Sequence, residues 1–382
     1  MIYLDYAATT PIREEALQTF IEASRKYYGN SNSLHDIGSQ ANELLEYCRK
    51  ELADLLGIST EGLYFTSGGT ESNIVSIRSM LAAQSSENAH LITTKSEHSS
   101  IYNLFKQLET EGYDVTYLPL TENGVVCVEQ LQEAIRDNTV LASIHYVNPE
   151  IGAIQPIKDI GRILKQRNIL FHSDCVQAFG KVPLESVNSI GLSSVSISSH
   201  KVYGPKGVGA VYIDPTIPIA SIYPGTTHEK GVRPGTLNVP AIASFVTAAM
   251  MTCDDLKTEQ KRMVLLRDKV TERIREMSSV SVIQGNEHSQ LPNILAFTIE
   301  GVEGQYTMLE YNRHGIAISA GSACQLNLQT PSRTFLAMGK SKDEAKQYVR
   351  ISMGRNTSDD DMDTFINVLH NIINSKTGKG DF

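Results

Sequence analysis

The sequence lacks several features that mark whole classes of protein. No apolar run approaches the ~18 residues that a membrane-spanning helix needs. No block of Lys or Arg appears either, and the formal net charge is −9, whereas recognition of nucleic acid needs a concentrated basic surface. Low-complexity tracts and internal repeats are also absent. The composition therefore predicts a globular protein that binds neither a membrane nor nucleic acid directly.

The N-terminus and the cysteines exclude further possibilities. The opening residues, MIYLDYAATTP, contain neither the basic segment nor the apolar core of a signal peptide, which predicts a cytoplasmic location. The five cysteines form no CxxC pair and no cluster with histidine, so no metal site is predicted. An odd number of scattered thiols is typical of a reducing compartment.

What the chain does contain is an alternation of short strands and amphipathic helices. Apolar residues at steps of three and four predict helices over residues 35–57, 99–111, 128–136 and 157–167. Short β-like runs predict strands over residues 63–65, 90–93, 114–118, 140–146, 169–172, 195–198 and 209–213. This alternation predicts an α/β fold whose mainly parallel seven-stranded sheet carries helices on both faces.

Length and a change of pattern predict two domains. A chain of 382 residues is too long for one ordinary core. After about Val239 the sequence changes to a long helix-rich stretch that is followed by a few strands. We therefore expect a large domain over residues 14–250 and a smaller α+β domain over residues 1–13 and 251–382.

Polar residues follow four of the predicted strands. Gly69 and Thr70 lie in a glycine turn before a helix, whose free N–H groups can hold a phosphate. His98, Asp174 and Lys201 follow three other strands, and the carboxyl ends of parallel strands meet at one edge of the sheet. Taken singly, a glycine turn, an N-cap or a packed histidine explains each of them.

Together these four groups match what pyridoxal phosphate requires of a protein. Its phosphate can bind at the helix N-terminus, and its pyridine nitrogen can pair with Asp174. Its aldehyde can form a Schiff base with Lys201. The sequence therefore predicts a pyridoxal-phosphate site.

The motifs at these positions resemble those of a known family. In sequence order they are YLDYAATTP, TSGGTESN, Glu97-His98, HSDCVQAFGK, SSHKVYGPKGVGA, RPGT, LPNILAFTIEGVEG, SAGSAC and VRISMGR. The set is similar to that of the NifS/IscS-type cysteine desulfurases, pyridoxal-phosphate enzymes within the fold-type I aminotransferase superfamily. The resemblance implies a homodimer that converts L-cysteine to L-alanine.

The resemblance also implies a role for each matching residue. Lys201 would form the Schiff base and move the Cα proton, and His98 would stack on the cofactor ring and shuttle protons. Gln177 would hold the ring oxygen, and Thr236 would reach the phosphate from a partner subunit. The implied cofactor-binding set is Gly69, Thr70, His98, Asp174, Gln177, Ser198, His200, Lys201 and Thr236.

Substrate binding and sulfur transfer are implied at two further positions. Arg350 would bind the substrate carboxylate, a task suited to a planar guanidinium. Cys324 would attack the substrate sulfur and carry it as a persulfide, because the thiolate is the reactive form of cysteine. Small residues over 319–323 predict a mobile loop that delivers sulfur to an acceptor or scaffold protein for iron–sulfur cluster, thio-cofactor or tRNA assembly.

Two departures from the family pattern leave details open. Asn148-Pro149-Glu150 stands where relatives commonly carry Asn-Asn-Glu, so either Gln177 holds the ring oxygen alone or Asn148 takes part. Asn148 is therefore expected, with Arg350, on the substrate side of the site. Thr226-Thr227-His228-Glu229 replaces Gly-Gly-Gln-Glu, which leaves subunit contacts and the choice of acceptor open.

Three other functions remain possible on the sequence. A selenocysteine lyase or an aminotransferase would keep Lys201 and Asp174 without requiring Cys324. A specialised desulfurase would serve one iron–sulfur client, for example an enzyme of NAD biosynthesis. A scaffold that recruits sulfur-transfer partners would not need the intact set of Lys201, His98, Asp174 and Cys324.

Overall fold

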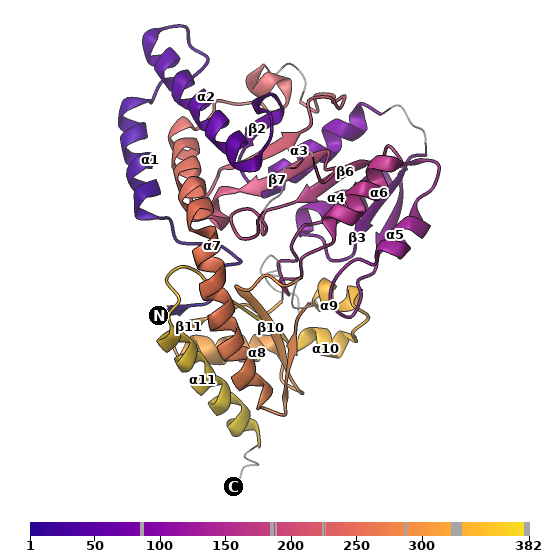
Figure 1. Cartoon of the computed structure of the whole chain (residues 1–382), viewed down its shortest axis with the longest axis vertical. Helices are drawn as coiled ribbons and strands as arrows, with labels where there is room; N and C mark the ends of the chain where they lie inside the picture. The colour runs from indigo at the N-terminus through magenta and orange to yellow at the C-terminus, as the bar shows by residue number, and fades with distance from the viewer. Residues whose placement is uncertain are drawn as a thin grey trace.

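The computed structural model describes residues 1–84, 88–183, 187, 189–223, 225, 227–285, 289–321 and 331–377. An upper lobe surrounds a seven-stranded sheet, and a lower lobe surrounds smaller sheets (Figure 1). The helix α7 (Val239–Arg275) runs from one lobe into the other without a break at residue 250. The predicted domain boundaries stay a prediction.

The large sheet confirms the predicted α/β architecture. Neighbouring strands are parallel except at β8, which is antiparallel to both of its neighbours. The strand order across the sheet is β2 (Leu63–Thr66), β8 (Gly209–Ile213), β7 (Ser194–Ser198), β6 (Leu170–Asp174), β5 (Thr139–Ser143), β3 (His90–Thr94) and β4 (Asp114–Leu118). All seven predicted strands are present, with ends that differ by at most three residues.

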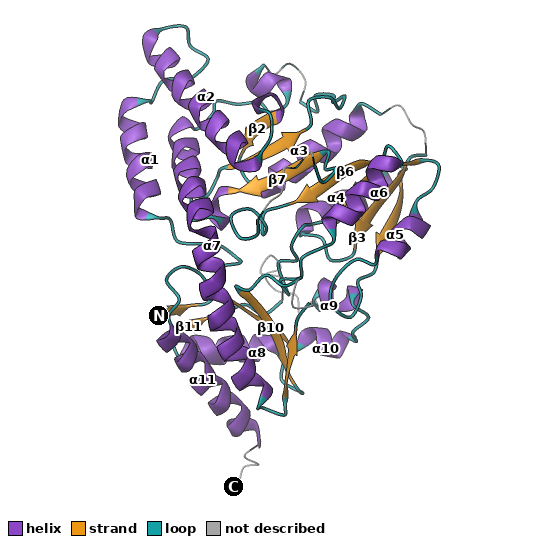
Figure 2. Cartoon of the chain, viewed as in Figure 1, coloured by secondary structure: helices purple, strands orange, loops and turns teal. Residues whose placement is uncertain are grey.

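Helices cover both faces of this sheet (Figure 2). Successive residues of a strand point to opposite faces, so Leu91 of β3 belongs to one apolar cluster and Ile92 to another. The Leu91 cluster includes α3 (Gly69–Ala82) and α4 (Ser99–Thr110). The Ile92 cluster includes α2 (Asp36–Leu56), α5 (Val128–Ala134), α6 (Ile157–Gln166) and the first half of α7. The helix α1 (Glu14–Lys26) packs on α7.

The lower lobe has its own apolar core. Strand β10 (Ile294–Ile299) lies between β12 (Tyr348–Ser352) and β9 (Val280–Ile283), both antiparallel to it. The short strands β1 (Ile2–Tyr3) and β11 (Ile316–Ala317) pair in parallel, which joins the N-terminus to this lobe. Phe365 of α11 stacks on Tyr311 of α8 at 4.8 Å and meets the ring of Phe297 edge-on. The remaining helices are α8 (Gly304–Arg313), α9 (Arg333–Ala337), α10 (Lys342–Lys346) and α11 (Asp359–Thr377).

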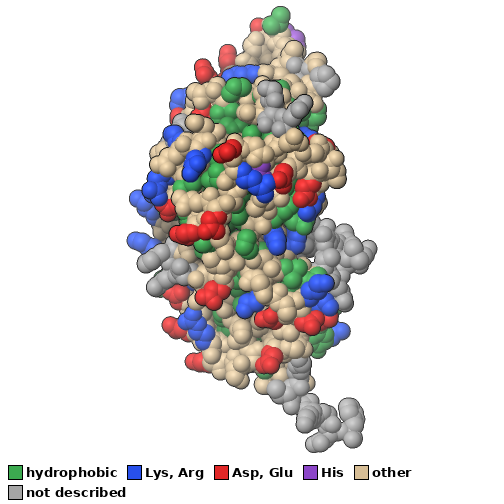
Figure 3. Space-filling view, turned by 90° about the vertical axis from the view of Figure 1, so that its right-hand side faces the viewer, with side chains coloured by type: hydrophobic (Ala, Val, Ile, Leu, Met, Phe, Trp, Pro, Cys, Tyr) green, Lys and Arg blue, Asp and Glu red, His purple; other side chains and the backbone are tan. Residues whose placement is uncertain are grey.

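Charged side chains of both signs share one face of the molecule, and one helix is apolar over a long stretch. On the face shown in Figure 3, Lys and Arg side chains are interspersed with Asp and Glu rather than gathered in one patch. By length and composition alone α7 could cross a membrane, but more than half of its apolar window is buried inside the protein. Such burial is typical of a core helix.

Candidate active site

Most of the predicted site residues line one cavity at the carboxyl ends of the central strands. The cavity measures about 280 Å³. The predicted residues in its wall are Gly69, Thr70, His98, Asp174, Gln177, Ser198, His200, Lys201 and Arg350. They come from the carboxyl ends of β6 and β7, from the helix or turn after β2, β3, β6 and β7, and from β12 of the lower lobe. The parallel strand arrangement thus brings together residues from Gly69 to Lys201, and the lower lobe adds Arg350.

Lys201 lies directly after β7, at the end of the short 3-10 helix η2 (Ser199–Lys201). Its Nζ donates hydrogen bonds to the backbone oxygens of Ala7, at 2.6 Å, and Ala8, at 2.8 Å. The segment after β1 therefore closes over the lysine and fixes the amine at the cavity wall.

One end of the cavity is built to hold an anion. Gly68 has a φ of 152°, a conformation that favours glycine, and it turns the chain from β2 into the N-terminus of α3. A Cβ on Gly69 would lie 2.7 Å from a methyl group of Val176, so the close approach of these segments also needs glycine. Ser198 is buried, and its hydroxyl has no hydrogen-bond partner among the described residues. The free N–H groups of α3 and this hydroxyl fit a phosphate group.

His200 lies at the same end of the cavity. Burial and the neighbouring Lys201 lower its pKa to about 4, so the imidazole is neutral near pH 7. Its Nδ1 lies 3.1 Å from the hydroxyl oxygen of Thr9, which fixes the ring.

Asp174 is held by two donors. It is the last residue of β6, rather than the first residue after the strand, and it is buried. Its Oδ1 accepts from the backbone N–H of Val176 at 2.9 Å, and its Oδ2 accepts from Nδ2 of Asn73 at 2.9 Å. These two hydrogen bonds fix the orientation of the carboxyl group, which suits a partner for the pyridine nitrogen of a bound cofactor.

His98 combines a capping role with a place in the cavity wall. It is the N-cap of α4, where its Nδ1 accepts from the backbone N–H of Ser100. The hydroxyl of Ser100 lies 2.8 Å from the same Nδ1. Because Nδ1 accepts, the neutral ring carries its proton on Nε2, so His98 can donate a proton from that atom.

A buried hydrogen-bond network that the sequence analysis missed connects Asp174 to His98. Nδ2 of Asn73 donates to both Asp174 and the hydroxyl of Ser100, which in turn contacts His98. Oδ1 of Asn73 accepts from Nε2 of His172, whose Nδ1 lies 2.8 Å from the hydroxyl of Ser194. Asn73 stands at the end of the TSGGTESN motif, and that position was the signal available in the sequence.

A second missed pair, Glu97 and His145, lies in the cavity wall. Oε1 of Glu97 accepts from the backbone N–H of His145 at 2.9 Å and lies 3.0 Å from its Nδ1. Both side chains are buried and line the cavity. This pair fixes the turn that carries His98, and the Glu97-His98 motif was the signal that pointed to it.

Arg350 is buried and already has two partners. One guanidinium nitrogen donates to Asp5 at 2.7 Å and the other to the backbone oxygen of Pro149 at 2.9 Å, while Nε has no partner among the described residues. Pro149, which departs from the family pattern, therefore helps to hold the arginine at the cavity. The guanidinium N–H groups of Arg350 that do not bond to Asp5 or Pro149 can donate to a carboxylate in the cavity.

Three predicted residues are not part of this described wall. The Asn148 side chain is fully buried and bonds to Thr334 and to the backbone of Glu150 and Ile151, whereas Gln177 lines the cavity and its ring-oxygen role stays a prediction. Thr236 is exposed and lies outside the cavity, where a partner subunit could use it. Cys324 and Thr226 lie outside the described residues.

Comparison with known proteins agrees with this geometry. The family model described as aminotransferase class-V matches residues 2–365. A Bacillus subtilis (strain 168) protein named "Putative cysteine desulfurase NifS" is 44% identical, and the alignment covers 100% of this chain and 97% of that protein. The "Cysteine desulfurase IscS" of Methanosarcina thermophila is 36% identical, with 97% of this chain and 92% of that protein covered.

Solved structures give the same result. A structure titled "NIFS-LIKE PROTEIN" is similar with a TM-score of 0.91 at 32% identity, and the match covers 98% of this chain and 99% of that one. A structure titled "SspA in complex with cysteine" has a TM-score of 0.80 at 32% identity and covers 92% and 99% of the two chains.

The chain belongs to the class-V aminotransferase family, whose cysteine desulfurases are pyridoxal-phosphate enzymes. Within that family it is a NifS/IscS-type enzyme. The helix N-terminus with Ser198, the Asp174 carboxylate and the Lys201 amine fit the phosphate, ring nitrogen and aldehyde of this cofactor.

Proposed function

We propose that this enzyme converts L-cysteine to L-alanine and transfers the sulfur to Cys324. The overall step balances as cysteine plus the Cys324 thiol giving alanine plus the Cys324 persulfide. The observation that carries the proposal is the convergence of Lys201, Asp174 and His98 on one cavity, in a chain whose relatives are named cysteine desulfurases.

Each described residue has a defined task in this proposal. The bound cofactor supplies an electron sink for the bonds at the substrate Cα and Cβ. Lys201 Nζ takes the Cα proton, and His98 Nε2 returns a proton to the substrate. Arg350 binds the substrate carboxylate and so orients the cysteine, while Asp174 keeps a negative charge beside the ring nitrogen.

The described thiols support Cys324 as the nucleophile. Burial raises the pKa of Cys48 to about 12 and that of Cys253 to about 11, and it raises the pKa of Cys175 further still. Such thiols are scarcely ionised at neutral pH, and the thiolate is the reactive form. Cys127, the N-cap of α5, donates to Glu129 and does not line the cavity.

Replacement of the nucleophile tests the proposal. Cys324→Ser should still bind the cofactor and L-cysteine, but alanine formation should fall by roughly a thousandfold or more, because a hydroxyl is a poor nucleophile toward divalent sulfur. Mass spectrometry of the wild type after exposure to cysteine should show one added sulfur on the Cys324 peptide. The matched control Cys127→Ser should keep full activity, and Lys201→Ala should lose it.

Two outcomes would contradict the proposal. Normal turnover by Cys324→Ser would favour an aminotransferase or a lyase that needs no thiol. Sulfur found on another cysteine would move the nucleophile to that residue.

We further propose that the enzyme is a cytoplasmic homodimer that passes sulfur to an acceptor or scaffold protein. The exposed Thr236 supports the dimer, since it lies outside its own cavity while its motif resembles one that reaches a partner's phosphate site. Thr236→Ala should weaken cofactor binding if the partner site uses it. Light scattering in solution measures the dimer directly.

A further inference from the structure

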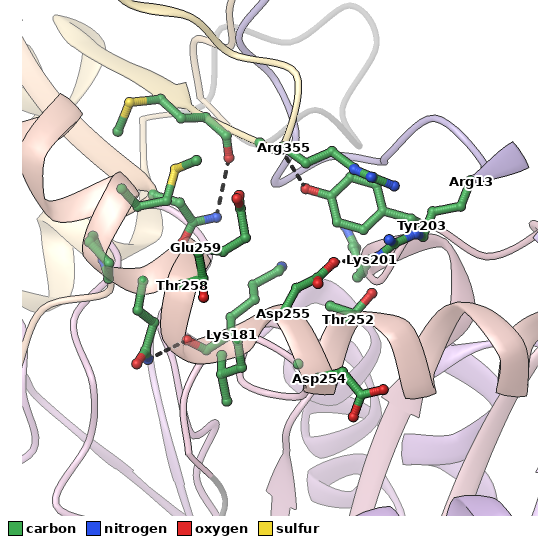
Figure 4. A pocket seen from close by; sticks show the side chains of 18 residues that line it. Arg13, Lys181, Lys201, Tyr203, Thr252, Asp254, Asp255, Thr258, Glu259 and Arg355 are labelled. Carbon is green, nitrogen blue, oxygen red and sulfur yellow. Dashed lines mark hydrogen bonds and ion pairs between the residues drawn. The ribbon is translucent and has the colours of Figure 1, made fainter. Parts of the chain in front are cut away.

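A second cavity lies on the other side of Lys201. It measures about 310 Å³ and is enclosed by the turn after β6, the middle of α7 and the segment after β12 (Figure 4). Lys201 lines this cavity as well as the active-site cavity, so it stands in the wall between them. Lys181 also lines the second cavity.

Two of the carboxylates around the second cavity, Asp255 and Glu259, have cationic partners other than Lys181. Asp255 pairs with Arg13 at 3.0 Å, and Glu259 pairs with Arg262 at 2.8 Å. Lys181 forms no ion pair among the described residues. Its Nζ donates instead to Oε1 of Gln177, at 2.7 Å.

This contact fixes which way the Gln177 amide faces. An ammonium group has only donors, so Gln177 must present its oxygen to Lys181. At the other end, Nε2 of Gln177 donates to the backbone oxygen of Ala7 at 2.7 Å, and a carbonyl oxygen can only accept. Two independent partners thus assign the same orientation. Gln177 is buried in the active-site wall, and in this orientation the second hydrogen on its Nε2 can donate to a ligand.

The same contacts join Lys181 to Lys201. The oxygen of Ala7 accepts from both Gln177 Nε2 and Lys201 Nζ. A continuous path of hydrogen bonds therefore runs from Lys181 through Gln177 and Ala7 to the amine at the centre of the site.

We propose that Lys181 is a positioning residue, whose charge holds the Gln177 amide with its N–H group ready for the ring oxygen of the cofactor. The inference rests on the proposed role of Gln177 in binding that oxygen. Lys181 lies outside the set of residues that would touch the cofactor, and it acts through the amide.

The surroundings of Lys181 make its charge sensitive to pH near neutrality. Burial, together with the nearby positive charges of Lys201 and Arg350, lowers the pKa of Lys181 to about 7. The other charged groups around the second cavity are Arg13, Asp254, Asp255, Glu259 and Arg355. Below pH 7 the ammonium makes a charge-assisted hydrogen bond to Gln177, and above pH 7 the neutral amine makes a weaker one.

Two substitutions lock the two charge states. Lys181→Met keeps the unbranched stem without a charge, and Lys181→Arg keeps a positive charge at every accessible pH. The readout is the dissociation constant of pyridoxal phosphate, measured by absorbance with the apo-enzyme at pH 6 to 9. At pH 6 Lys181→Met should bind about tenfold more weakly than the wild type, and this ratio should shrink as the pH rises through about 7.

The wild type and the two variants share every other titrating group, so the ratio of their dissociation constants reports on Lys181 alone. In Lys181→Arg, cofactor binding should not show the weakening with rising pH that Lys181 causes in the wild type. Lys165→Met is the control, since Lys165 is exposed near the end of α6, which leads into the amino end of β6. A constant ratio from pH 6 to 9 would overturn the role of the charge.

A double-mutant cycle tests whether Lys181 acts through Gln177. In a Gln177→Met background, Lys181→Met should have no further effect on the dissociation constant. Equal effects in both backgrounds would show that Lys181 acts independently and would overturn the inference. The dissociation constant of the cofactor is measured without turnover. A protein without desulfurase activity would therefore disprove the proposed function, and equal effects in both backgrounds would still be needed to overturn the role of Lys181. Thermal unfolding of the apo-variants separates a loss of fold from a loss of positioning.

Discussion

Strand β6 of the upper sheet and strand β10 of the lower lobe are both largely buried but carry different side chains. In β6 the buried residues include His172, Ser173 and Asp174, whereas β10 reads ILAFTI. Buried polar groups cost free energy unless they are hydrogen-bonded, and here their partners lead to the active site. Strand β10 belongs to a conventional apolar core, while the upper sheet uses part of its interior to hold groups of the candidate site.

The difference predicts that a core substitution in the lower lobe lowers stability and leaves the cofactor site intact. Phe297 of β10 is fully buried and contacts Phe365. Phe297→Ala should lower the free energy of unfolding by about 4 kcal/mol, through lost burial and the cavity left behind. Chemical denaturation measures this loss.

The dissociation constant of the cofactor should be unchanged in the same variant at a temperature where it is folded. Phe297→Leu, which keeps much of the volume, should cost less. A Phe297→Ala protein with normal stability but weakened cofactor binding would show that the two regions are not independent.

The second prediction uses acid to separate the two regions. Burial lowers the pKa of His172 to about 4, against an ordinary value near 6.5, so the folded protein binds fewer protons than the unfolded chain between these values. The contribution to stability is complete above pH 6.5 and is lost as the pH falls through 4. It amounts to about 3 kcal/mol for His172.

His200 has a pKa lowered to about 4 as well, so it adds to this acid sensitivity. Among the residues that the structure describes, the histidines of the lower lobe, His314 and His370, are exposed. Hydrogen exchange at pH 5 should therefore show larger losses of protection in β6 and β7 than in β10. His172→Gln should flatten the dependence of unfolding free energy on pH. Equal acid sensitivity of β10 would contradict the assignment.

The same contrast explains how much the sequence could predict. Strand positions, the carboxyl edge of the sheet and the residues Lys201, Asp174, His98 and Thr70 follow from local pattern, because each lies next to a strand that the pattern marks. Apolar alternation also gives the two faces of the sheet. These features depend on short stretches of sequence.

What could not be predicted depends on contacts between distant segments. Asn73 meets Asp174 across 101 residues, and Arg350 meets Asp5 across 345. Nothing local distinguishes an asparagine that will bond to a buried carboxylate from one that faces solvent. The motif pattern placed Asn148 near the cofactor, but its side chain is used to hold a turn.

The smallest expected effect concerns Asn73, which joins the polar interior of the upper sheet to the site. Asn73→Ala removes one donor from Asp174 and leaves Nε2 of His172 without its acceptor. The carboxylate keeps the N–H group of Val176, so the cofactor dissociation constant should rise by about tenfold, equivalent to about 1.4 kcal/mol. Asn138→Ala is the matched control, since Asn138 is exposed and its side chain bonds to the backbone oxygen of Asn88, away from the cavity. If both variants bind the cofactor as the wild type does, the buried network supports the fold alone, and the polar interior of the upper sheet is not part of the site.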